Sequence, residues 1–593
     1  MSPPDFLWVS AKGIPFEGYL FLEPVDELLL LSEASPQDIR EFFKALQQRV
    51  KEGLYALGFV SYELGYLFEK RLHPLFRKPE LPLAHFILFK DIEKTSLFPL
   101  KENPAFKISA PELLTEPENY LQAISRIKHY IATGDTYQVN FTTKFRFTFQ
   151  GDPFELFRAL LFSQRCEHAC FFRHSSYTLL SLSPELFLKK RGESLFSAPM
   201  KGTIKRGYLL EEDRFLRQKL KGDPKTQAEN VMILDLLRND LGRVSQLGSV
   251  WAPRVFKVKT YPSLHQMISE VRGRPKRDSL FEIFQGLFPS GSVTGAPKIR
   301  TMEIIAELEE EPRNLYTGAM GFLTPDGDFT FNVAIRSVFL KPLSENLYTG
   351  ELGVGAGIVW DSEPEAEFEE TKLKADFFFK ALPYFELFET FLWEEGSPWL
   401  YLHYQRIRRS ATFFAFKIPR ELKDFGSFRG FLKEKIPGED KPLRVKLMLS
   451  PEGNTKLILE SLTQIGWDKD IRVGLVERKT PKGVFHFHKT TQRQEYDLWR
   501  ERAKASGFTE IVFYNEKEEL LEGTISNVFV KIRDKYLTPP VELGLLPGVL
   551  REDLIQKGLA EEATLRIEDL KGNEVFIGNS LRGLGKVKEW VIL

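Results

Sequence analysis

The sequence has very few cysteines, no net charge and no long hydrophobic run, and each absence excludes a class of protein. Two cysteines in 593 residues are too few for a disulfide-stabilised secreted scaffold. Lysine plus arginine and aspartate plus glutamate both number 82, so no overall field attracts nucleic acid or an anionic membrane. The apolar stretches are shorter than the ~18 residues of a membrane helix, and no leader peptide is evident at the N-terminus. We therefore expect a cytoplasmic protein.

The residues that form hydrophobic cores are plentiful. Hydrophobic residues make up 42 % of the chain and aromatic residues 13 %, which is typical of folded domains. Strand-like and helix-like runs alternate, which predicts an α/β (α+β) fold. The clearest break lies near Pro383, where a helical pattern ends and an alternating, strand-like one begins. We expect two closely packed domains, 1–382 and 383–593, although a prior of roughly 150 residues per domain would give about four.

Two segments of the first domain each contain a residue that could be either structural or catalytic. Glu185 interrupts an apolar run; it is either a strand-edge glutamate in solvent or a carboxyl whose raised pKa suits general-acid catalysis. Lys201 precedes Gly202; it is either part of a surface turn or a desolvated amine nucleophile next to a flexible backbone.

Acidic residues on two predicted helices form another candidate site. Glu367, Glu370 and Lys374 are spaced so that they share one helix face. Alone, they read as a solvated helix with a stabilising ion pair. Together with Glu229 on an earlier helix they would suit Mg²⁺, which needs few protein oxygens and retains water ligands.

Seven short motifs over about residues 1–380 resemble, in the same order, those of the chorismate-utilising enzymes. The motifs lie at 134–140, 183–187, 228–240, 292–298, 332–336, 355–359 and 367–371. The resemblance implies a β-sheet sandwich with flanking helices, with Mg²⁺ bound by Glu229 and Glu370 together with Glu367, and with Glu185 as the general acid. It also implies substrate contacts from Gly202, Thr203, His265, Thr294, Tyr316, Arg336, Gly355, Gly357 and Lys374.

Two positions narrow the resemblance to one reaction. Family members that add water to chorismate carry a lysine where this chain has Gln138, and anthranilate synthases carry an alanine where it has Lys201. The aminodeoxychorismate synthase subunits carry that lysine. The resemblance therefore implies that Lys201 attacks ring carbon 2 as the carbon-4 hydroxyl leaves, after which ammonia adds at carbon 4 and expels the lysine.

The source of the ammonia is a separate question. Cys166 and Cys170 lack the flanking glycines of a glutaminase nucleophile. We expect ammonia from a separate glutamine amidotransferase subunit or from solution. With His168 the two cysteines resemble a metal cluster, but three ligands within five residues cannot close a structural zinc site alone. Buried thiols are the better interpretation.

The second domain carries a different set of candidate residues. Lys489 follows alternating aromatic and histidine residues, Glu522 lies at a turn entering a β run, and the loop at 546–548 opens a predicted helix whose free amides suit an anion. Each is unremarkable alone. His486 and His488 could bind a metal, but no cysteine or carboxylate accompanies them, and we expect a structural role.

Together these segments resemble the fold-type IV pyridoxal-phosphate (PLP) enzymes over about residues 384–593, a two-subdomain α/β fold. The resemblance implies Lys489 as the Schiff-base lysine and Glu522 as the partner of the pyridinium nitrogen. The implied phosphate anchors are Arg406, Val549, Leu550 and Ser580. Two departures from the family's pattern are Gln492, where asparagine is common, and Leu550, where threonine often contacts phosphate.

The two resemblances on one chain imply a bifunctional enzyme of folate synthesis. Chorismate and ammonia would give 4-amino-4-deoxychorismate, from which the PLP domain would eliminate pyruvate to leave 4-aminobenzoate. A homodimer through the C-terminal domain is a further expectation from the fold-type IV family. One alternative is an anthranilate-synthase-like domain fused to a branched-chain or D-amino-acid aminotransferase. Another is that one half is a non-catalytic interaction module.

Overall fold

The computed structural model describes residues 4–10, 13–97, 106–394, 397–436, 442–462, 465–467 and 470–593. Residues 1–3, part of the N-terminal segment considered above for a leader, lie outside this range. The chain forms two compact units. One contains Met1–Arg206 and Phe215–Tyr384, and the other contains Gly207–Arg214 and Phe385–Leu593.

The strands of the first unit form a continuous antiparallel series. Hydrogen bonding connects, in this order, β7 (Gln138–Gln150), β19 (Leu347–Ile358), β18 (Ser337–Ser344), β9 (Tyr177–Ser183), β8 (His168–His174), β1 (Phe6–Val9), β2 (Phe16–Leu30), β4 (Ala84–Leu97), β3 (Tyr55–Val60), β16 (Ala319–Leu323), β17 (Phe329–Val333), β10 (Leu186–Arg191), β11 (Ser194–Ala198), β14 (Leu264–Gly273) and β13 (Trp251–Thr260). The short strands β15 (Gly295–Ala296) and β12 (Met200–Lys205) pair with β7 and β14. Both carry motifs singled out in the sequence.

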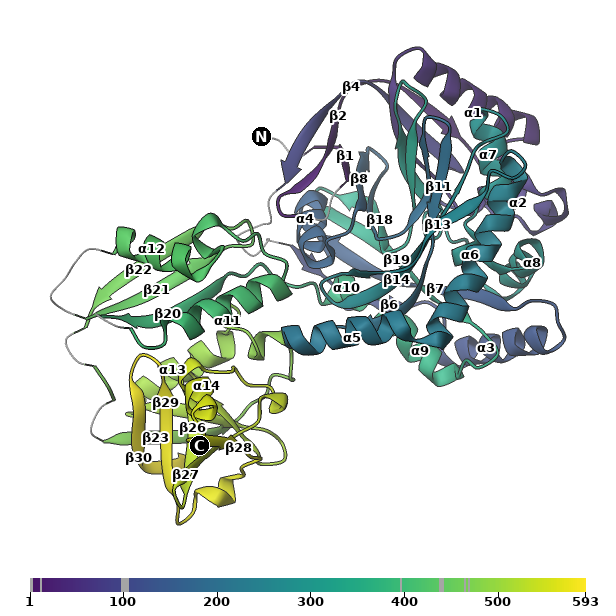
Figure 1. The fold of residues 1–593 in the computed structure, drawn as a ribbon. Helices are drawn as coiled ribbons and strands as arrows, with labels where there is room; N and C mark the ends of the chain where they lie inside the picture. Colours follow the sequence, from purple (N-terminus) through teal and green to yellow (C-terminus); the bar gives the residue numbers. More distant parts are fainter. Residues whose placement is uncertain are drawn as a thin grey trace. The chain divides into compact units, whose positions relative to one another are not determined.

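Local sequence explains where the flanking helices begin. Ser35 and Asp38 form a reciprocal capping box at the start of α1 (Pro36–Lys51), and such a box satisfies two otherwise unpaired amides. Asp223 accepts from an amide in the first turn of α6 (Pro224–Val244). Figure 1 shows α1, α6 and α7 (Leu280–Leu287) gathered along one side of the first unit.

Strand β3 shows why the first unit needs layers on both faces of its sheet. Ala56 and Val60 belong to a buried cluster that includes apolar side chains of α1, α6 and α7. Leu57 and Phe59 point the opposite way, into a second cluster with side chains of β1, β8 and β9. One face is thus covered by helices and the other by strands. The predicted sandwich with flanking helices is confirmed.

The second unit has two subdomains (Figure 1). The first is an antiparallel sheet of β20 (Leu387–Trp393), β21 (Leu443–Leu449) and β22 (Thr455–Ser461), with α11 (Leu400–Phe413) and α12 (Phe425–Lys435). In the second, pairing runs in a closed ring through β25 (Leu520–Gly523), β24 (Glu510–Tyr514), β23 (Ile471–Glu477), β30 (Gly583–Ile592), β29 (Glu574–Asn579) and β26 (Asn527–Ile532), which pairs with β25 again. The predicted two-subdomain α/β fold is confirmed.

No helix in the described part of the chain has both the length and the apolar character needed to cross a bilayer.

Candidate active sites

In the first candidate site, Lys201 on β12 lies close to Glu229 and to Gly357. Its ammonium nitrogen Nζ is 4.0 Å from Oε2 of Glu229 on α6, and the two side chains are 25 % and 34 % exposed. A methyl group added at Gly357 would lie 3.6 Å from this nitrogen and 3.0 Å from Nε2 of Gln138. The lysine and the amide therefore flank one small space beside β19, kept open by a glycine.

The backbone next to Lys201 requires a glycine. Gly202 has a φ of +98°, and a Cβ there would lie 2.1 Å from the side chain of Thr226 on α6. Asn230, one turn further along α6, donates from Nδ2 to the carbonyl of Lys201 over 3.0 Å. Helix α6 thus fixes the strand that carries Lys201. Thr203 follows on the same strand.

Glu185 lies in the short connection between β9 and β10 and is 4 % exposed. Burial raises its pKa to about 7, although a hydrogen bond from Ser292 opposes the shift. The Ser292 hydroxyl donates to Oε1 of Glu185 over 2.5 Å. A carboxyl in this state holds its proton to nearly neutral pH, as a general acid requires.

The remaining acidic residues lie on α9 (Pro364–Leu373). Glu370 Oε1 is 2.9 Å from Nζ of Lys374, and the same ammonium donates to the carbonyl of Gly355 over 2.9 Å. Glu367 accepts from the Ser362 hydroxyl over 2.6 Å. The predicted helix face is therefore tied to β19 through Lys374.

The donor set fits Mg²⁺ in its chemistry but is not a closed cage. Glu229, Glu367 and Glu370 do not form a compact group of ligand atoms within the described part of the chain. The side chains of Glu229 and Glu370 are 34 % and 59 % exposed. Partly open carboxylates of this kind suit a cation that retains water and substrate ligands.

Three other residues predicted to contact substrate form hydrogen bonds with neighbouring protein groups. Thr294 is fully buried, with its hydroxyl donating to the carbonyl of Ser290 over 3.0 Å. His265, also fully buried, lies 2.9 Å through Nδ1 from the hydroxyl of Thr260. Arg336 donates to Oε1 of Gln164 over 2.6 Å, and burial lowers its pKa.

Tyr316 is set by close packing. Its ring lies so near Gly353 on β19 that a Cβ there would be 2.1 Å from the ring, and burial raises the pKa of its phenol. Whether it, Thr294, His265 and Arg336 contact substrate stays a prediction.

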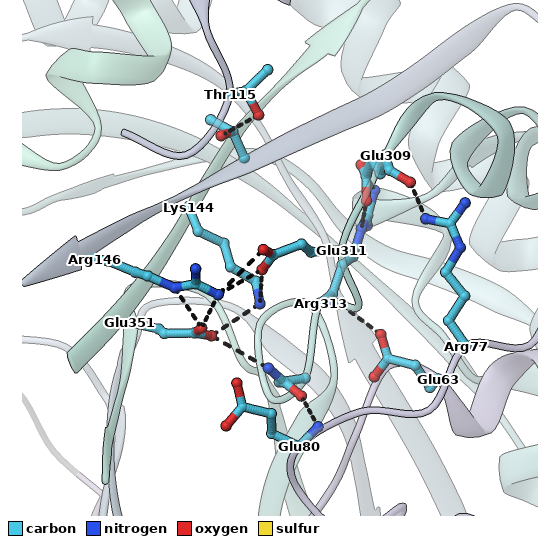
Figure 2. Close-up of polar contacts among 12 residues, drawn as sticks. Glu63, Arg77, Glu80, Thr115, Lys144, Arg146, Glu309, Glu311, Arg313 and Glu351 are labelled. Atoms are coloured by element: carbon cyan, nitrogen blue, oxygen red, sulfur yellow. Dashed lines mark hydrogen bonds and ion pairs between the residues drawn. The ribbon is translucent and has the colours of Figure 1, made fainter. Parts of the chain in front are cut away.

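Arg313 is a framework residue that sequence reasoning missed (Figure 2). Its guanidinium, 3 % exposed, donates to both carboxylate oxygens of Glu309 over 2.8 and 2.6 Å. It also donates to the carbonyls of Val293 over 3.0 Å and Asn140 over 2.7 Å. Glu63 accepts from the Arg313 amide over 2.6 Å. One buried cation thus joins two of the sequence motifs.

The cysteines behave as expected of structural residues. Cys166 and Cys170 are both free and buried. Burial raises the pKa of Cys166 to about 12 and also raises that of Cys170, whereas a reactive thiol needs a lowered pKa. The prediction of buried thiols is confirmed.

A further group, Glu27, His85 and His174, brings three potential ligand atoms within 4.8 Å of one another. Nε2 of His85 is 3.0 Å from the carboxylate, and its Nδ1 pairs with the hydroxyl of Tyr177. Nδ1 of His174 accepts from the amide of Ser176 over 3.3 Å, and its Nε2 lies 3.8 Å from the Glu27 carboxylate. Hydrogen bonds to Glu27, Tyr177 and Ser176 thus hold the two rings.

The second candidate site centres on Lys489. Its Nζ lies 4.9 Å from the centre of the Phe388 ring, and its carbonyl accepts from the amide of Phe388 over 3.0 Å. Burial, reinforced by the cations Arg406 and Arg493, lowers its pKa to about 7. This lysine can therefore be a neutral amine near neutral pH, which is the form that reacts with an aldehyde.

Glu522 on β25 faces the same site from the barrel. Both of its carboxylate oxygens accept hydrogen bonds, from the Tyr496 hydroxyl over 2.7 Å and from the amide of Leu546 over 3.1 Å. Burial raises its pKa to about 7 despite these bonds. A cation placed against it would favour the ionised form, as expected of the partner of a pyridinium nitrogen.

Arg406 is held by a residue that the sequence did not reveal. Its guanidinium donates to the two oxygens of Glu389 over 2.8 and 2.6 Å. The same carboxylate lies 2.7 Å from Nδ1 of His403, and Nε2 of that ring is 2.9 Å from the hydroxyl of Ser580. Burial raises the pKa of Glu389, but the charges and hydrogen bonds of Arg406 and His403 together lower it to about 2. Two predicted phosphate anchors, Arg406 and Ser580, thus share one network.

Val549 and Leu550 form the first turn of α14 (Val549–Gln556) after Gly548. Amides of a first helical turn lack partners within the helix and favour an anion. A Cβ at Gly548 would lie 1.9 Å from the side chain of Asn527, so the approach to this turn requires glycine. A buried amine, a carboxylate, a cation and free amides together fit PLP in donor chemistry.

The two histidines before Lys489 are held by hydrogen bonds. His488 has Nδ1 2.9 Å from the hydroxyl of Ser410 and Nε2 2.9 Å from the carbonyl of Tyr208. Nδ1 of His486 accepts from the amide of Gly483 over 3.0 Å. These contacts agree with the structural role expected from the sequence.

Comparisons with known proteins identify a different family model in each part of the chain. Residues 4–380 match the family model described as chorismate binding enzyme, and residues 386–590 match the one described as amino-transferase class IV. The aminodeoxychorismate synthase component 1 of Klebsiella aerogenes is 36 % identical over 341 residues, which cover 53 % of this chain and 74 % of that protein. The protein of the same name from Bacillus subtilis (strain 168) is 31 % identical over 401 residues, or 60 % and 84 % of the two chains.

Among solved structures, the anthranilate synthase component I of Streptococcus pneumoniae TIGR4 superposes with a TM-score of 0.52. It is 24 % identical and covers 61 % of this chain and 91 % of its own. This likeness concerns the fold alone.

Proposed function

We propose that this chain, which belongs to the chorismate-binding enzyme family and also carries a class IV aminotransferase domain, makes 4-aminobenzoate from chorismate and ammonia. The observation that carries the proposal is the position of Lys201. Its amine lies 4.0 Å from the Glu229 carboxylate and 3.6 Å from the position that a Cβ at Gly357 would take. The C-terminal domain of the same chain contains a second lysine, Lys489, which is buried and has its pKa lowered to about 7. Two domains are proposed, 1–382 and 383–593.

In the first reaction Lys201 forms a bond from Nζ to ring carbon 2 of chorismate. The ring double bonds shift and the carbon–oxygen bond at carbon 4 breaks. Glu185, which holds a proton up to a pH of about 7 because of its raised pKa, protonates the departing hydroxyl so that it leaves as water. Ammonia then bonds to carbon 4, the double bonds shift back and the bond to Lys201 breaks. The product is 4-amino-4-deoxychorismate.

The other proposed residues of this site bind and orient the substrate. Glu229 and Glu370, with Glu367, would hold Mg²⁺, which supplies positive charge for substrate carboxylate and developing oxyanion. Lys374 and Arg336 are cations suited to the carboxylates. The proposed close-approach and ring contacts are Gly202, Thr203, His265, Thr294, Tyr316, Gly355 and Gly357.

In the second reaction the PLP domain removes pyruvate from that product. PLP, when bound, supplies an electron sink for the carbon next to the amino group. Lys489, with its pKa lowered to about 7, takes the proton from this carbon and can return one, and loss of pyruvate leaves an aromatic ring. Glu522 is proposed as the residue that would pair with the cofactor's ring nitrogen. Phosphate contacts are proposed for Arg406, Val549, Leu550 and Ser580.

Three aspects of the setting are part of the proposal. Ammonia comes from a separate glutamine amidotransferase subunit, because Cys166 and Cys170 are buried without a lowered pKa. The protein is placed in the cytoplasm, in keeping with these two free thiols. Association of two copies through the C-terminal domain remains an expectation from the fold-type IV family.

Product chromatography with single omissions tests the proposal. The purified chain is incubated with chorismate, ammonium, Mg²⁺ and PLP, and each component is left out in turn. We expect 4-aminobenzoate from the full mixture, 4-amino-4-deoxychorismate without PLP, and no product without Mg²⁺. Formation of ortho-aminobenzoate, or transfer of an amino group to a 2-oxo acid, would overturn the proposal. Product from glutamine in place of ammonium would refute the need for a separate amidotransferase.

A further inference from the structure

Residues Gly207–Arg214 belong to the second unit although they lie far from it in the sequence. They begin one residue after β12, the strand of Lys201, and run into α5 (Leu210–Gly222). The class IV match covers residues 386–590 and so does not include them. This octapeptide, called here the 207–214 segment, is an addition to the PLP domain from outside that domain's own sequence.

The side chain of Tyr208 packs flat against the residue two positions before Lys489. Its ring and that of Phe487 have centroids 4.7 Å apart and planes at 6°. Phe487 is 4 % exposed and forms a buried cluster with Val541 and Leu545. The segment therefore covers an apolar surface immediately before the reactive lysine.

The backbone of Tyr208 contacts the residue next to Lys489. Its carbonyl lies 2.9 Å from Nε2 of His488, whose Nδ1 lies 2.9 Å from the hydroxyl of Ser410 on α11. A carbonyl can only accept, so Nε2 carries the proton and Nδ1 accepts from the serine. His488 is 5 % exposed. It is held between α11 and the 207–214 segment in one tautomer.

The segment is shaped for this contact by its own hydrogen bonds. The amide of Tyr208 donates to Oε2 of Glu212 over 2.7 Å, and the amide of Gly207 to Oδ1 of Asp213 over 3.2 Å. A Cβ at Gly207 would lie 2.6 Å from the Asp213 amide, so only glycine allows this turn. Two carboxylates thus close the start of α5 and present Tyr208.

We propose that Tyr208 is a positioning residue for Lys489, and that the PLP site is complete only when the 207–214 segment is docked. By fixing Phe487 and His488, Tyr208 limits the motion of the backbone that carries the lysine. The part of this inference that concerns PLP binding rests on the proposed function of the second domain. The part that concerns the restraint of the 484–490 backbone is independent of that function.

The test compares full-length variants. Tyr208→Ala removes the stacked ring, Tyr208→Phe retains it, and Tyr208→Leu retains an apolar side chain without the stack. Phe215→Ala is the matched control, because Phe215 is an aromatic residue of α5, the helix that follows Tyr208, and it is 68 % exposed and belongs to the first unit. Thermal melting establishes which variants are folded.

Hydrogen exchange of residues 484–490 without PLP is the first readout. We expect exchange about tenfold faster in Tyr208→Ala, the effect of losing a stacked aromatic pair. Tyr208→Phe and Phe215→Ala should exchange at the parent rate. Tyr208→Leu should exchange faster than the parent, and it replaces Tyr208→Ala in the comparison if the Ala variant does not fold. Equal exchange in the parent and Tyr208→Ala, or in Tyr208→Leu if the Ala variant does not fold, would overturn the proposal.

PLP affinity and the pH profile of Lys489 labelling form the second readout. In Tyr208→Ala, PLP should bind about five- to tenfold more weakly, and the midpoint of labelling by an amine reagent should move toward higher pH. The KM for chorismate in the first reaction should not change. A parent protein that fails to bind PLP would refute the proposed function of the second domain, while the exchange comparison would still decide the role of Tyr208.

Discussion

Lys201 and Lys489 are both proposed as reactive amines, yet they lie in opposite electrostatic surroundings. The amine of Lys201 is partly exposed and lies 4.0 Å from the carboxylate of Glu229. That of Lys489 is enclosed near Arg406 and Arg493, which together with burial bring its pKa to about 7. A lysine must be neutral to act as a nucleophile. Burial and two neighbouring cations provide for this at Lys489, whereas the charged group beside Lys201 is a carboxylate.

The strongest test of the difference between the two lysines is to remove each in turn. Lys201→Ala should lower formation of 4-amino-4-deoxychorismate about 1,000-fold or more, while supplied 4-amino-4-deoxychorismate is still converted at the parent rate. Lys489→Ala should do the reverse, so that the intermediate accumulates. Each variant is the control for the other, measured by chromatography of both products. Full first-step turnover in Lys201→Ala would show that ammonia attacks without a covalent bond to the enzyme.

Glu185→Gln should show that the ionised carboxyl of Glu185, the proposed general acid, is unfavourable for the stability of the fold. Loss of the proton donor should slow the first reaction about 100- to 10,000-fold. The pKa of Glu185 is about 7 in the folded protein and 4.5 ordinarily, so the folded state holds a proton that the unfolded state releases between these values. Above pH 7 the buried charge therefore destabilises the fold by up to about 3 kcal/mol.

Melting curves at two pH values check this sign. The variant should melt at a higher temperature than the parent at pH 8 and at the same temperature at pH 4.5. Glu193→Gln, which changes an exposed glutamate on the turn after β10, is the control and should alter neither activity nor melting. A stabilising effect of Glu185→Gln that is equal at both pH values would contradict the assignment.

The smallest expected effect concerns the hydroxyl that supports Glu522. Tyr496→Phe removes the donor 2.7 Å from Oε1 of that carboxylate, and this hydrogen bond is what lowers the pKa of Glu522 most against the effect of burial. Without this hydrogen bond the neutral form of Glu522 becomes more populated, and a neutral carboxyl is a weaker partner for a pyridinium cation. We expect PLP affinity to fall about fivefold at pH 7 and less at pH 8.5. Tyr401→Phe, an exposed tyrosine on α11, should leave binding unchanged; an equal loss at both pH values would argue against this role of Tyr496.

The sequence predicted those site residues that occur in short motifs. Glu185, Lys201, Lys489 and Glu522 could be singled out because the segments that contain them resemble those of two enzyme families, although each residue alone has an ordinary interpretation. The structure places each of them in a buried or partly buried site with a chemical partner. The fold class followed from the same motifs together with the change of pattern near Pro383.

The residues that sequence reasoning missed act through distant partners. Arg313 follows three glutamates and a proline, which read as a solvated loop, and its role appears only when Val293 and Asn140 are folded against it. Glu389 alternates within an ordinary strand pattern. Tyr208 carries no local signal, because its contacts depend on a fold that brings residues 280 positions apart together.

The separation between Tyr208 and His488 also orders events during synthesis. At roughly 5 to 20 residues per second, a ribosome needs about 15 to 60 s to extend the chain by the 280 positions from Tyr208 to His488. During that time the first unit can collapse around β12 while the 207–214 segment has no partner and its aromatic ring remains in water. A nascent chain of this protein therefore exposes the Tyr208 ring to water until Phe487 and His488 have been synthesised.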